Sequence, residues 1–153
     1  MADFDSRVDT YEHIHRVECN LLDVIRELLN RLQHHDGSKL SGIEKETFDR
    51  VTPALRELTY GSDEYKAQLA DMGPALAEHY ALNRHHPEHF ANGIRGMTLV
   101  DVLEMLCDWE AATHRHANGS LAKSIRLNQT RFDYSDELRN LLENTARAYG
   151  WNS

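Results

Sequence analysis

The sequence predicts an all-α fold, and three observations lead to this prediction. Apolar residues recur at helical spacing along the chain, several segments open with residue patterns typical of helix N-termini, and no stretch alternates apolar and polar residues as a strand would. With 153 residues, of which 41% are hydrophobic and 27% charged, the chain has the size of one domain with a substantial core. We therefore expect a single helical domain over residues 1–153.

The first predicted helix, from Val8 to Leu32, is the longest. Neither Pro nor Gly interrupts it, and its apolar side chains form one broad stripe. This stripe is wider than one small domain easily covers, which favours a homodimer. The stripe consists of Tyr11, Ile14, Val17, Leu21, Val24, Ile25, Leu28 and Leu32.

Six shorter helices are expected after a turn at Gly37. Ser41-Gly-Ile-Glu44 has the pattern of a capping box and opens the second helix, which breaks near Pro53 or frays toward Tyr60-Gly61. Residues 83–96 contain several breakers and are predicted to form a loop. Caps and breakers predict four further helices and a last one. The four run from Ser62 to Met72, from Pro74 to Leu82, from Leu99 to His114 after a Thr98–Asp101 capping box, and from Ser120 to Asn128. The last helix is capped by Ser135 and ends near Tyr149.

Composition excludes several classes of partner. The formal net charge of −8 argues against binding to a nucleic acid polymer or to an anionic membrane, because both need basic patches. No apolar run approaches the length of a membrane span, and the N-terminus lacks the pattern of a signal peptide. The two cysteines, Cys19 and Cys107, lie in apolar helical contexts and are expected to be reduced core residues. We expect a cytoplasmic protein.

A histidine-rich segment is the clearest functional signal, because residues 79–89 hold four of the ten histidines. Neutral imidazole and carboxylate groups bind divalent transition metals. A His-Asp pair precedes the segment and a helix rich in carboxylates follows it, so the chain is expected to be a metal-binding domain. The residues expected to bind the metal are His35, Asp36, His79, Glu104 and Asp108.

Each of these residues also has a structural interpretation. A histidine such as His35 complements the dipole at a helix C-terminus, and a lone histidine on an apolar face is usually a satisfied core residue. Asp101 stands at the capping position of its helix. Glu104 and Asp108 have no such local role, but an arginine could pair with them inside the largely apolar helix 99–111, which should be buried. The candidate arginines are Arg84, Arg95 and Arg115.

Two short motifs resemble the His-Asp metal-dependent phosphohydrolase superfamily. They are His13-Ile-His-Arg-Val17 and His35-Asp-Gly-Ser-Lys39. This resemblance implies a helical fold of that superfamily, a site for one or two metals that activates water against a phosphate ester, and His13 as a further metal ligand. However, 22 residues of unbroken helix between His13 and His35 span about 33 Å. Either this helix breaks, or a partner subunit supplies His13, or His13 is not a ligand.

A closer resemblance covers almost the whole chain. It is to an uncharacterised family found in bacteria and phages, and it implies a bacterial cell or a phage-infected host as the location. No activity comes with it, and Glu78 stands where similar sequences often have another histidine. The matching motifs are Glu12-His-Ile14, His35-Asp-x-Ser-Lys-Leu40, Glu44, Tyr60-Gly-Ser-x-Glu-Tyr65, His79-Tyr80, Asn83-x-His-His-Pro-Glu-His89, Gly96-Met-x-Leu-x-Asp101, Glu104-Met-Leu-x-Asp-Trp109, Asn128-x-x-Arg-Phe132 and Asn144-Thr145.

The leading hypothesis is a metal-dependent phosphohydrolase that acts on a small phosphorylated metabolite, most plausibly a nucleotide. The metal would be a divalent transition ion such as zinc, manganese, iron, cobalt or nickel. Asp36, Lys39 and Glu104 are the expected catalytic residues. The expected phosphate-binding residues are Lys39, Arg84, His85, His86 and His89. The alternatives are a di-iron oxygenase on a similar scaffold and a nonenzymatic phage protein that binds a nucleotide or a host factor.

Overall fold

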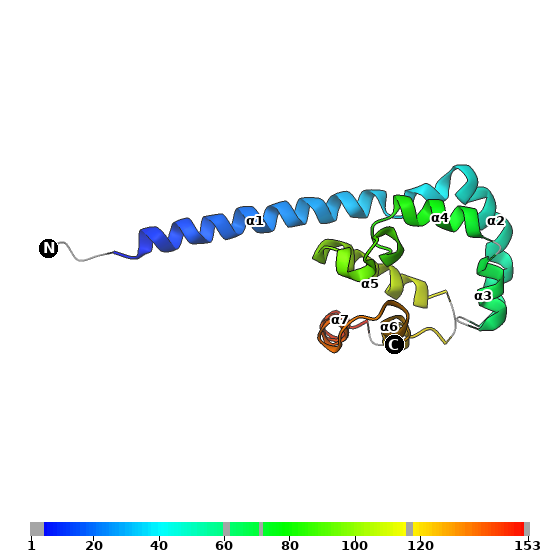
Figure 1. Ribbon diagram of the computed structural model, residues 1–153. Coiled ribbons are helices and arrows are strands. Elements are labelled where there is room, and N and C mark those ends of the chain that lie inside the picture. Colours follow the sequence, from blue (N-terminus) through cyan, green and yellow to red (C-terminus); the bar gives the residue numbers. More distant parts are fainter. Residues whose placement is uncertain (1–4, 60–61, 71, 116–117, 152–153) are drawn as a thin grey trace. The chain divides into compact units, whose positions relative to one another are not determined.

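The fold is helical, as expected. The computed structural model describes residues 5–59, 62–70, 72–115 and 118–151, and these residues contain helices and turns but no strand (Figure 1). The chain divides into two compact units, residues 1–35 and 36–153. Each unit is described by itself below, and the expectation of a single domain stays a prediction.

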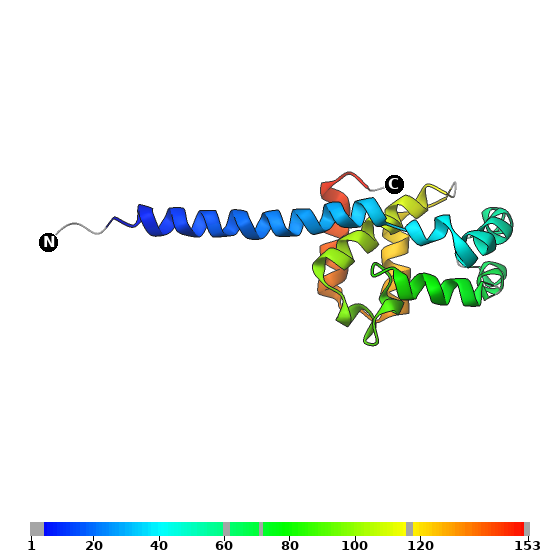
Figure 2. The same ribbon diagram turned by 90° about the horizontal axis from the view of Figure 1, so that it is seen from above.

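The first unit is dominated by one helix, α1 (Arg7–His34), which runs without interruption in both views (Figures 1 and 2). The predicted helix from Val8 to Leu32 is therefore confirmed. No residue of α1 is buried, and seven of the eight apolar side chains of its stripe are between 40% and 75% exposed, whereas Leu28 is partly buried. This helix consequently has the pattern of an amphipathic helix without a core of its own.

The second unit contains the remaining elements. Short 3₁₀ turns separate longer α-helices, and two of these turns lie in the segment 83–96 that was predicted to be a loop. In chain order the elements are η1 (Gly37–Leu40), α2 (Gly42–Arg56), α3 (Asp63–Ala70), α4 (Gly73–Leu82), η2 (Pro87–His89), η3 (Gly93–Gly96), α5 (Leu99–Thr113), α6 (Leu121–Phe132) and α7 (Asp136–Ala148).

Helix α2 departs from the sequence prediction at its start. Ser41 occupies the N-cap with an extended backbone, but its side chain makes no capping hydrogen bond, so the expected capping box is wrong. The reason is that Glu44 is 2% exposed and turns into the interior instead of back toward the helix start. The helix also continues past Pro53 and ends at Arg56, and the predicted fraying segment Tyr60-Gly61 lies outside the described residues.

The other predicted caps are confirmed. Ser62 accepts a hydrogen bond from the backbone N–H of Tyr65, and Ser135 accepts one from Leu138. Thr98 and Asp101 form the predicted reciprocal capping box at the start of α5. Pro74 lies in the first turn of α4, where its missing N–H costs no helical hydrogen bond. Helix α6 runs four residues beyond the predicted end at Asn128.

The apolar core of the second unit lies among α5, α6 and α7, together with η3. Helix α5 contributes only one face to it, so the expectation that this helix is buried on all sides is wrong: Leu99 is 79% exposed. A separate set of contacts joins α2 to η1, α3 and α4. The buried core residues are Ile94, Met105, Leu106, Leu121, Ile125, Tyr134, Leu142 and Ala146.

Two further sequence predictions concern cysteines and membranes. Cys19 and Cys107 are free, but both are exposed, so the prediction that they belong to the core is wrong. Among the described residues, no helix has the length and apolar character needed to cross a membrane.

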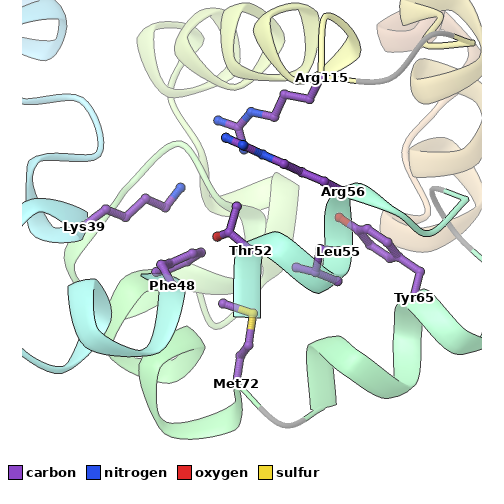
Figure 3. A pocket seen from close by; sticks show the side chains of 8 residues that line it. All are labelled: Lys39, Phe48, Thr52, Leu55, Arg56, Tyr65, Met72 and Arg115. Carbon is purple, nitrogen blue, oxygen red and sulfur yellow. The ribbon is translucent and has the colours of Figure 1, made fainter. Parts of the chain in front are cut away.

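A cavity of about 420 Å³ opens beside α2 in the second unit (Figure 3). Phe48, Thr52 and Arg56 line it at four-residue intervals, so they share one face of α2. Lys39 from η1 and Arg115, two residues after the end of α5, complete its cationic lining.

Candidate metal centre

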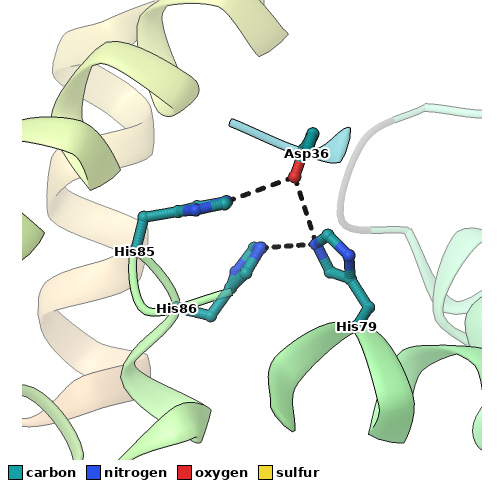
Figure 4. A group of neighbouring side chains, drawn as sticks. All are labelled: Asp36, His79, His85 and His86. Carbon is teal, nitrogen blue, oxygen red and sulfur yellow. Dashed lines mark hydrogen bonds and ion pairs between the residues drawn. The ribbon is translucent and has the colours of Figure 1, made fainter. Parts of the chain in front are cut away.

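Four of the predicted site residues converge in the second unit: Asp36, His79, His85 and His86 (Figure 4). Each offers one ligand atom, and these atoms all lie within 4.8 Å of one another. His79 lies on α4, whereas His85 and His86 lie in the segment that follows it. The turn after α4 therefore brings two loop histidines back toward the one on the helix.

Asp36 opens the second unit in a left-handed backbone conformation, with φ 55° and ψ 16°. Aspartate adopts this region more readily than most residues because its short polar side chain can bond locally. Its Oδ2 atom accepts a hydrogen bond of 2.5 Å from Lys39 Nζ. Its Oδ1 atom lies 3.4 Å from His79 Nε2 and 3.5 Å from His85 Nε2. One oxygen thus holds the lysine while the other faces two histidines.

A buried carboxylate fixes the orientation of His79, which is 1% exposed. Glu44 Oε2 lies 2.9 Å from His79 Nδ1 and accepts a further hydrogen bond of 2.9 Å from Ser38 Oγ. Asn83 Nδ2 also lies close to Nδ1, but it donates its two hydrogens to Ser38 Oγ and to the backbone carbonyl of His79. Nδ1–H of His79 therefore donates to Glu44, which leaves Nε2 directed at Asp36.

His85 repeats this arrangement with a second carboxylate. It is 2% exposed, and its Nδ1 lies 3.2 Å from Glu104 Oε1 while its Nε2 faces Asp36. A carboxylate behind the far nitrogen of a ligating histidine is a recurring feature of metal sites, where it sets the tautomer and the ring direction. Glu104, predicted as a ligand, is thus placed behind His85 instead of in the four-residue group.

His86 completes the group, with its Nε2 atom 2.8 Å from His79 Nε2. Burial, with help from the neighbouring His85 and His79, lowers the pKa of His86 to about 3, although Asp108 opposes the shift. Burial and the nearby Lys39 likewise lower the pKa of His79, against the opposing effect of Asp36 and Glu44. Both rings are therefore neutral near pH 7, which is the form that binds metals.

The spacing of the ligand atoms fits a transition metal. Four ligands at about 2.0–2.1 Å from a tetrahedral ion lie about 3.3–3.4 Å from one another. The two distances from Asp36 Oδ1, 3.4 and 3.5 Å, match this separation. The two histidine Nε2 atoms at 2.8 Å are closer by about half an ångström, so His86 would shift slightly to join the same ion.

Comparison with known proteins identifies the family of the chain. The family DUF5662, described as a family of unknown function, matches residues 2–148. The chain belongs to this family. No curated protein and no solved structure matches it. The expected membership of an uncharacterised family is thus confirmed. Because the function of the family is unknown, membership assigns no activity to this site.

Asp108 and His35 have different relations to the group. Within the second unit, Asp108 offers a ligand atom within 4.8 Å of those of Asp36 and His85, so it lies at the margin of the cluster. His35 is the last residue of the first unit, where it is exposed and follows α1 as its C-cap. Its role as a ligand stays a prediction.

The continuity of α1 answers the question about His13. Because the helix neither breaks nor bends back between His13 and His35, these two residues of one chain lie about 33 Å apart and cannot bind the same ion. The part of the metal prediction that joined them in one chain is wrong. The helical hairpin that would bring such residues together is not formed in α1.

Two predicted phosphate-binding residues are engaged in structural contacts. Arg84 donates two hydrogen bonds to the fully buried Asp101, at 3.1 and 3.2 Å, and its guanidinium lies over the ring of Phe90. The sequence suggested Arg84 as a partner for Glu104 or Asp108, but the structure pairs it with Asp101. His89 Nδ1 lies 2.9 Å from the backbone carbonyl of Tyr80. Both side chains therefore help hold the segment that carries His85 and His86.

The sequence reasoning missed the polar residues that support the site. Glu44 was assigned to a helix cap, and Ser38 and Asn83 were noted only as parts of motifs. Glu44 and Asn83 are buried, and the three side chains link η1, α2 and α4. The one signal in the sequence was Glu44 in the capping pattern at Ser41. If this glutamate does not cap the helix and is buried, it must have another polar partner.

Proposed function

We propose that the chain is a metal-dependent phosphohydrolase that acts on a small phosphorylated metabolite, with a nucleotide as the expected substrate. The observation that carries this proposal is the convergence of Asp36 with three histidines, two of which have a carboxylate behind Nδ1. Groups of exposed acidic residues are common without a metal, but here His79 and His85 are almost fully buried. Buried polar side chains normally have bonding partners, and a shared metal ion would serve as the partner of this group.

The charge of the site suits a phosphate ester. Histidines bind a metal as neutral imidazoles, so a divalent ion held by Asp36 and three histidines would carry a net positive charge over this ligand set, before Glu44 and Glu104 behind the histidines are counted. Lys39 adds a further positive charge beside it, with Nζ 2.5 Å from Asp36. A positive centre of this kind attracts a phosphoryl group and stabilises the negative charge that develops on its oxygens.

The roles of the residues follow from these contacts. His79, His85, His86 and Asp36 would hold the ion, and Glu44 and Glu104 would orient two of the histidines. Such an ion supplies Lewis acidity and a bound water of lowered pKa. Lys39 neutralises a phosphate oxygen as a point charge, since a protonated lysine cannot ligate a metal.

A di-iron oxygenase is a weaker candidate for the same residues. Di-iron carboxylate proteins of helical bundles use glutamates as most of their ligands. The group here contains three histidines and one aspartate, and its glutamates stand behind the histidines. This balance of ligands differs from that of the di-iron carboxylate proteins.

The test joins metal content to turnover. The protein is purified without a histidine tag, its metals are measured by elemental analysis, and phosphate release is followed over a panel of nucleotides with added zinc, manganese, iron, cobalt or nickel. Asp36→Asn keeps the size of the side chain but removes its charge, so metal content and turnover should both fall at least tenfold. Lys39→Ala should keep its metal and lose substrate affinity.

Asp49→Asn is the matched control, because Asp49 lies on α2 in an exposed ion pair with Lys45. It should retain metal content and turnover within twofold of the unaltered protein. Phosphate release by metal-free Asp36→Asn at the full rate would refute the mechanism. Visible absorbance of oxidised iron together with oxygen consumption would instead support the oxygenase, and nucleotide binding that survives metal removal without any turnover would support a nonenzymatic binder.

A further inference from the structure

The cavity beside α2 contains two arginines that the metal centre does not use, Arg56 and Arg115. Arg56 is the last residue of α2 and Arg115 lies two residues after the end of α5, and both side chains line the cavity (Figure 3). Among the described residues, neither side chain has a hydrogen bond or an ion pair. Both are exposed, so water screens their mutual repulsion. Two unpaired guanidinium groups facing one cavity can bind one dianion between them.

Lys39 and Phe48 connect this cavity with the metal centre. Lys39 lines the cavity and also donates to Asp36. Phe48 lines the cavity, lies under Lys39 with its ring centroid 5.2 Å from Nζ, and meets the ring of His79 edge-on at 6.1 Å. A molecule that reaches from Asp36 into the cavity therefore passes Lys39 first and meets the arginines farther in.

The remaining walls suit the organic part of a phosphorylated metabolite. Leu55 and Met72 give apolar surface, Phe48 and Tyr65 give aromatic rings, and Thr52 adds a hydroxyl. A volume of about 420 Å³ lies in the range of small-molecule sites. Apolar and aromatic walls with a few polar groups at one end are typical of sites that orient a ligand by its charged part.

We propose that this cavity is a second anion site, in which Arg56 and Arg115 bind a phosphate other than the one held at Asp36 and Lys39. The substrate class is therefore a metabolite with at least two phosphates. A monophosphate would occupy only one of the two anion sites. Guanidinium groups bind phosphate through paired N–H donors, so the second phosphate contributes both affinity and direction. The inference rests on the proposed function only for the phosphate at Asp36, since the arginines bind their anion whether or not turnover follows.

The test is calorimetric titration of the full chain with ADP, AMP, inorganic pyrophosphate and inorganic phosphate, each with and without a chelator. ADP should bind at least tenfold more tightly than AMP, and pyrophosphate more tightly than phosphate. Arg56→Ala and Arg115→Ala should each weaken ADP binding about five- to tenfold and leave AMP binding within about threefold. Arg56→Lys should recover part of the loss, because it restores the charge without the paired donors.

Arg50→Ala is the matched control, because Arg50 lies on the same helix, is exposed and does not line the cavity. It should leave all four affinities within twofold. Equal binding of ADP and AMP, no binding of either at millimolar concentration, or equal effects of Arg50→Ala and Arg56→Ala would overturn the proposal. If the protein prefers ADP, even when metal-free, but shows no turnover with any metal, the second anion site stands and the hydrolase is refuted. If it shows turnover but no preference for ADP, the hydrolase stands and the second anion site is refuted.

Discussion

Helix α1 and helix α5 both carry large apolar side chains but use them differently. Along α1, seven of the eight side chains of the stripe are at least 40% exposed, and no residue of the helix is buried. In α5, Met105 and Leu106 are each 1% exposed and pack against α6 and α7. Helical periodicity is therefore evidence for a helix and for an apolar face, but it does not say what covers that face. The comparison leads to three predictions.

The largest difference should appear in stability. Leu106→Ala removes buried methyl groups from the core of the second unit and should lower the free energy of unfolding by about 2–5 kcal/mol. Leu21→Ala on α1 removes a side chain that is 57% exposed, so at submicromolar concentration the change should stay below about 1 kcal/mol. Chemical denaturation followed by circular dichroism measures both. Equal losses in the two variants would mean that the α1 stripe is covered within the chain.

The α1 stripe should instead matter for association. We predict that two copies of the chain bury this stripe against each other, which gives a particle near twice the mass of 17.6 kDa in light scattering at micromolar concentration. Leu21→Glu places a charge in the middle of the stripe and should weaken the dimer at least tenfold. Asn30→Glu is the control, since Asn30 lies on the opposite side of the same helix. A monomer at all concentrations, for the unaltered protein, would contradict the prediction.

The smallest expected effect is that of pH on the free energy of unfolding, and it should arise in the second unit. Because the pKa of His86 is lowered from 6.5 to about 3 in the fold, the unfolded chain takes up this proton first as the pH falls. Stability is then complete above about pH 6.5 and declines toward pH 3, and His86 alone should cost about 1 kcal/mol between pH 6.5 and 5.5 in metal-free protein. The measurement is denaturation of the metal-free protein at a series of pH values.

His86→Gln should flatten this decline, whereas His13→Gln on α1 should leave it unchanged. His13 is exposed in the first unit, so it offers a histidine substitution outside the second unit. An equal pH dependence in the unaltered protein and in His86→Gln would show that the ring is not held neutral by its surroundings.

Local sequence patterns gave most of the helices correctly and failed where a side chain had a distant partner. The caps at Thr98 and Ser135 were predictable because a capping bond joins residues three apart in the chain. The same pattern at Ser41 failed because Glu44 bonds instead to His79, 35 residues away. Of the two expected ends of α2, a break near Pro53 does not occur, because the helix continues to Arg56.

The sequence alone determined the helical class, the length of α1 and the residue types of a candidate metal centre, because these depend on periodicity, on the lack of breakers and on ligand chemistry. Only the tertiary structure decided which residues meet. It brought Asp36 together with His79, His85 and His86, put Glu44 and Glu104 behind two of the histidines, and bound Arg84 to Asp101. It also opened a cavity between Arg56 and Arg115, which are 59 residues apart in the sequence. The physical reason is that a coordination sphere or an anion site is a set of distances in space, and these distances follow from the packing of helices that the spacing of residues along the chain does not encode.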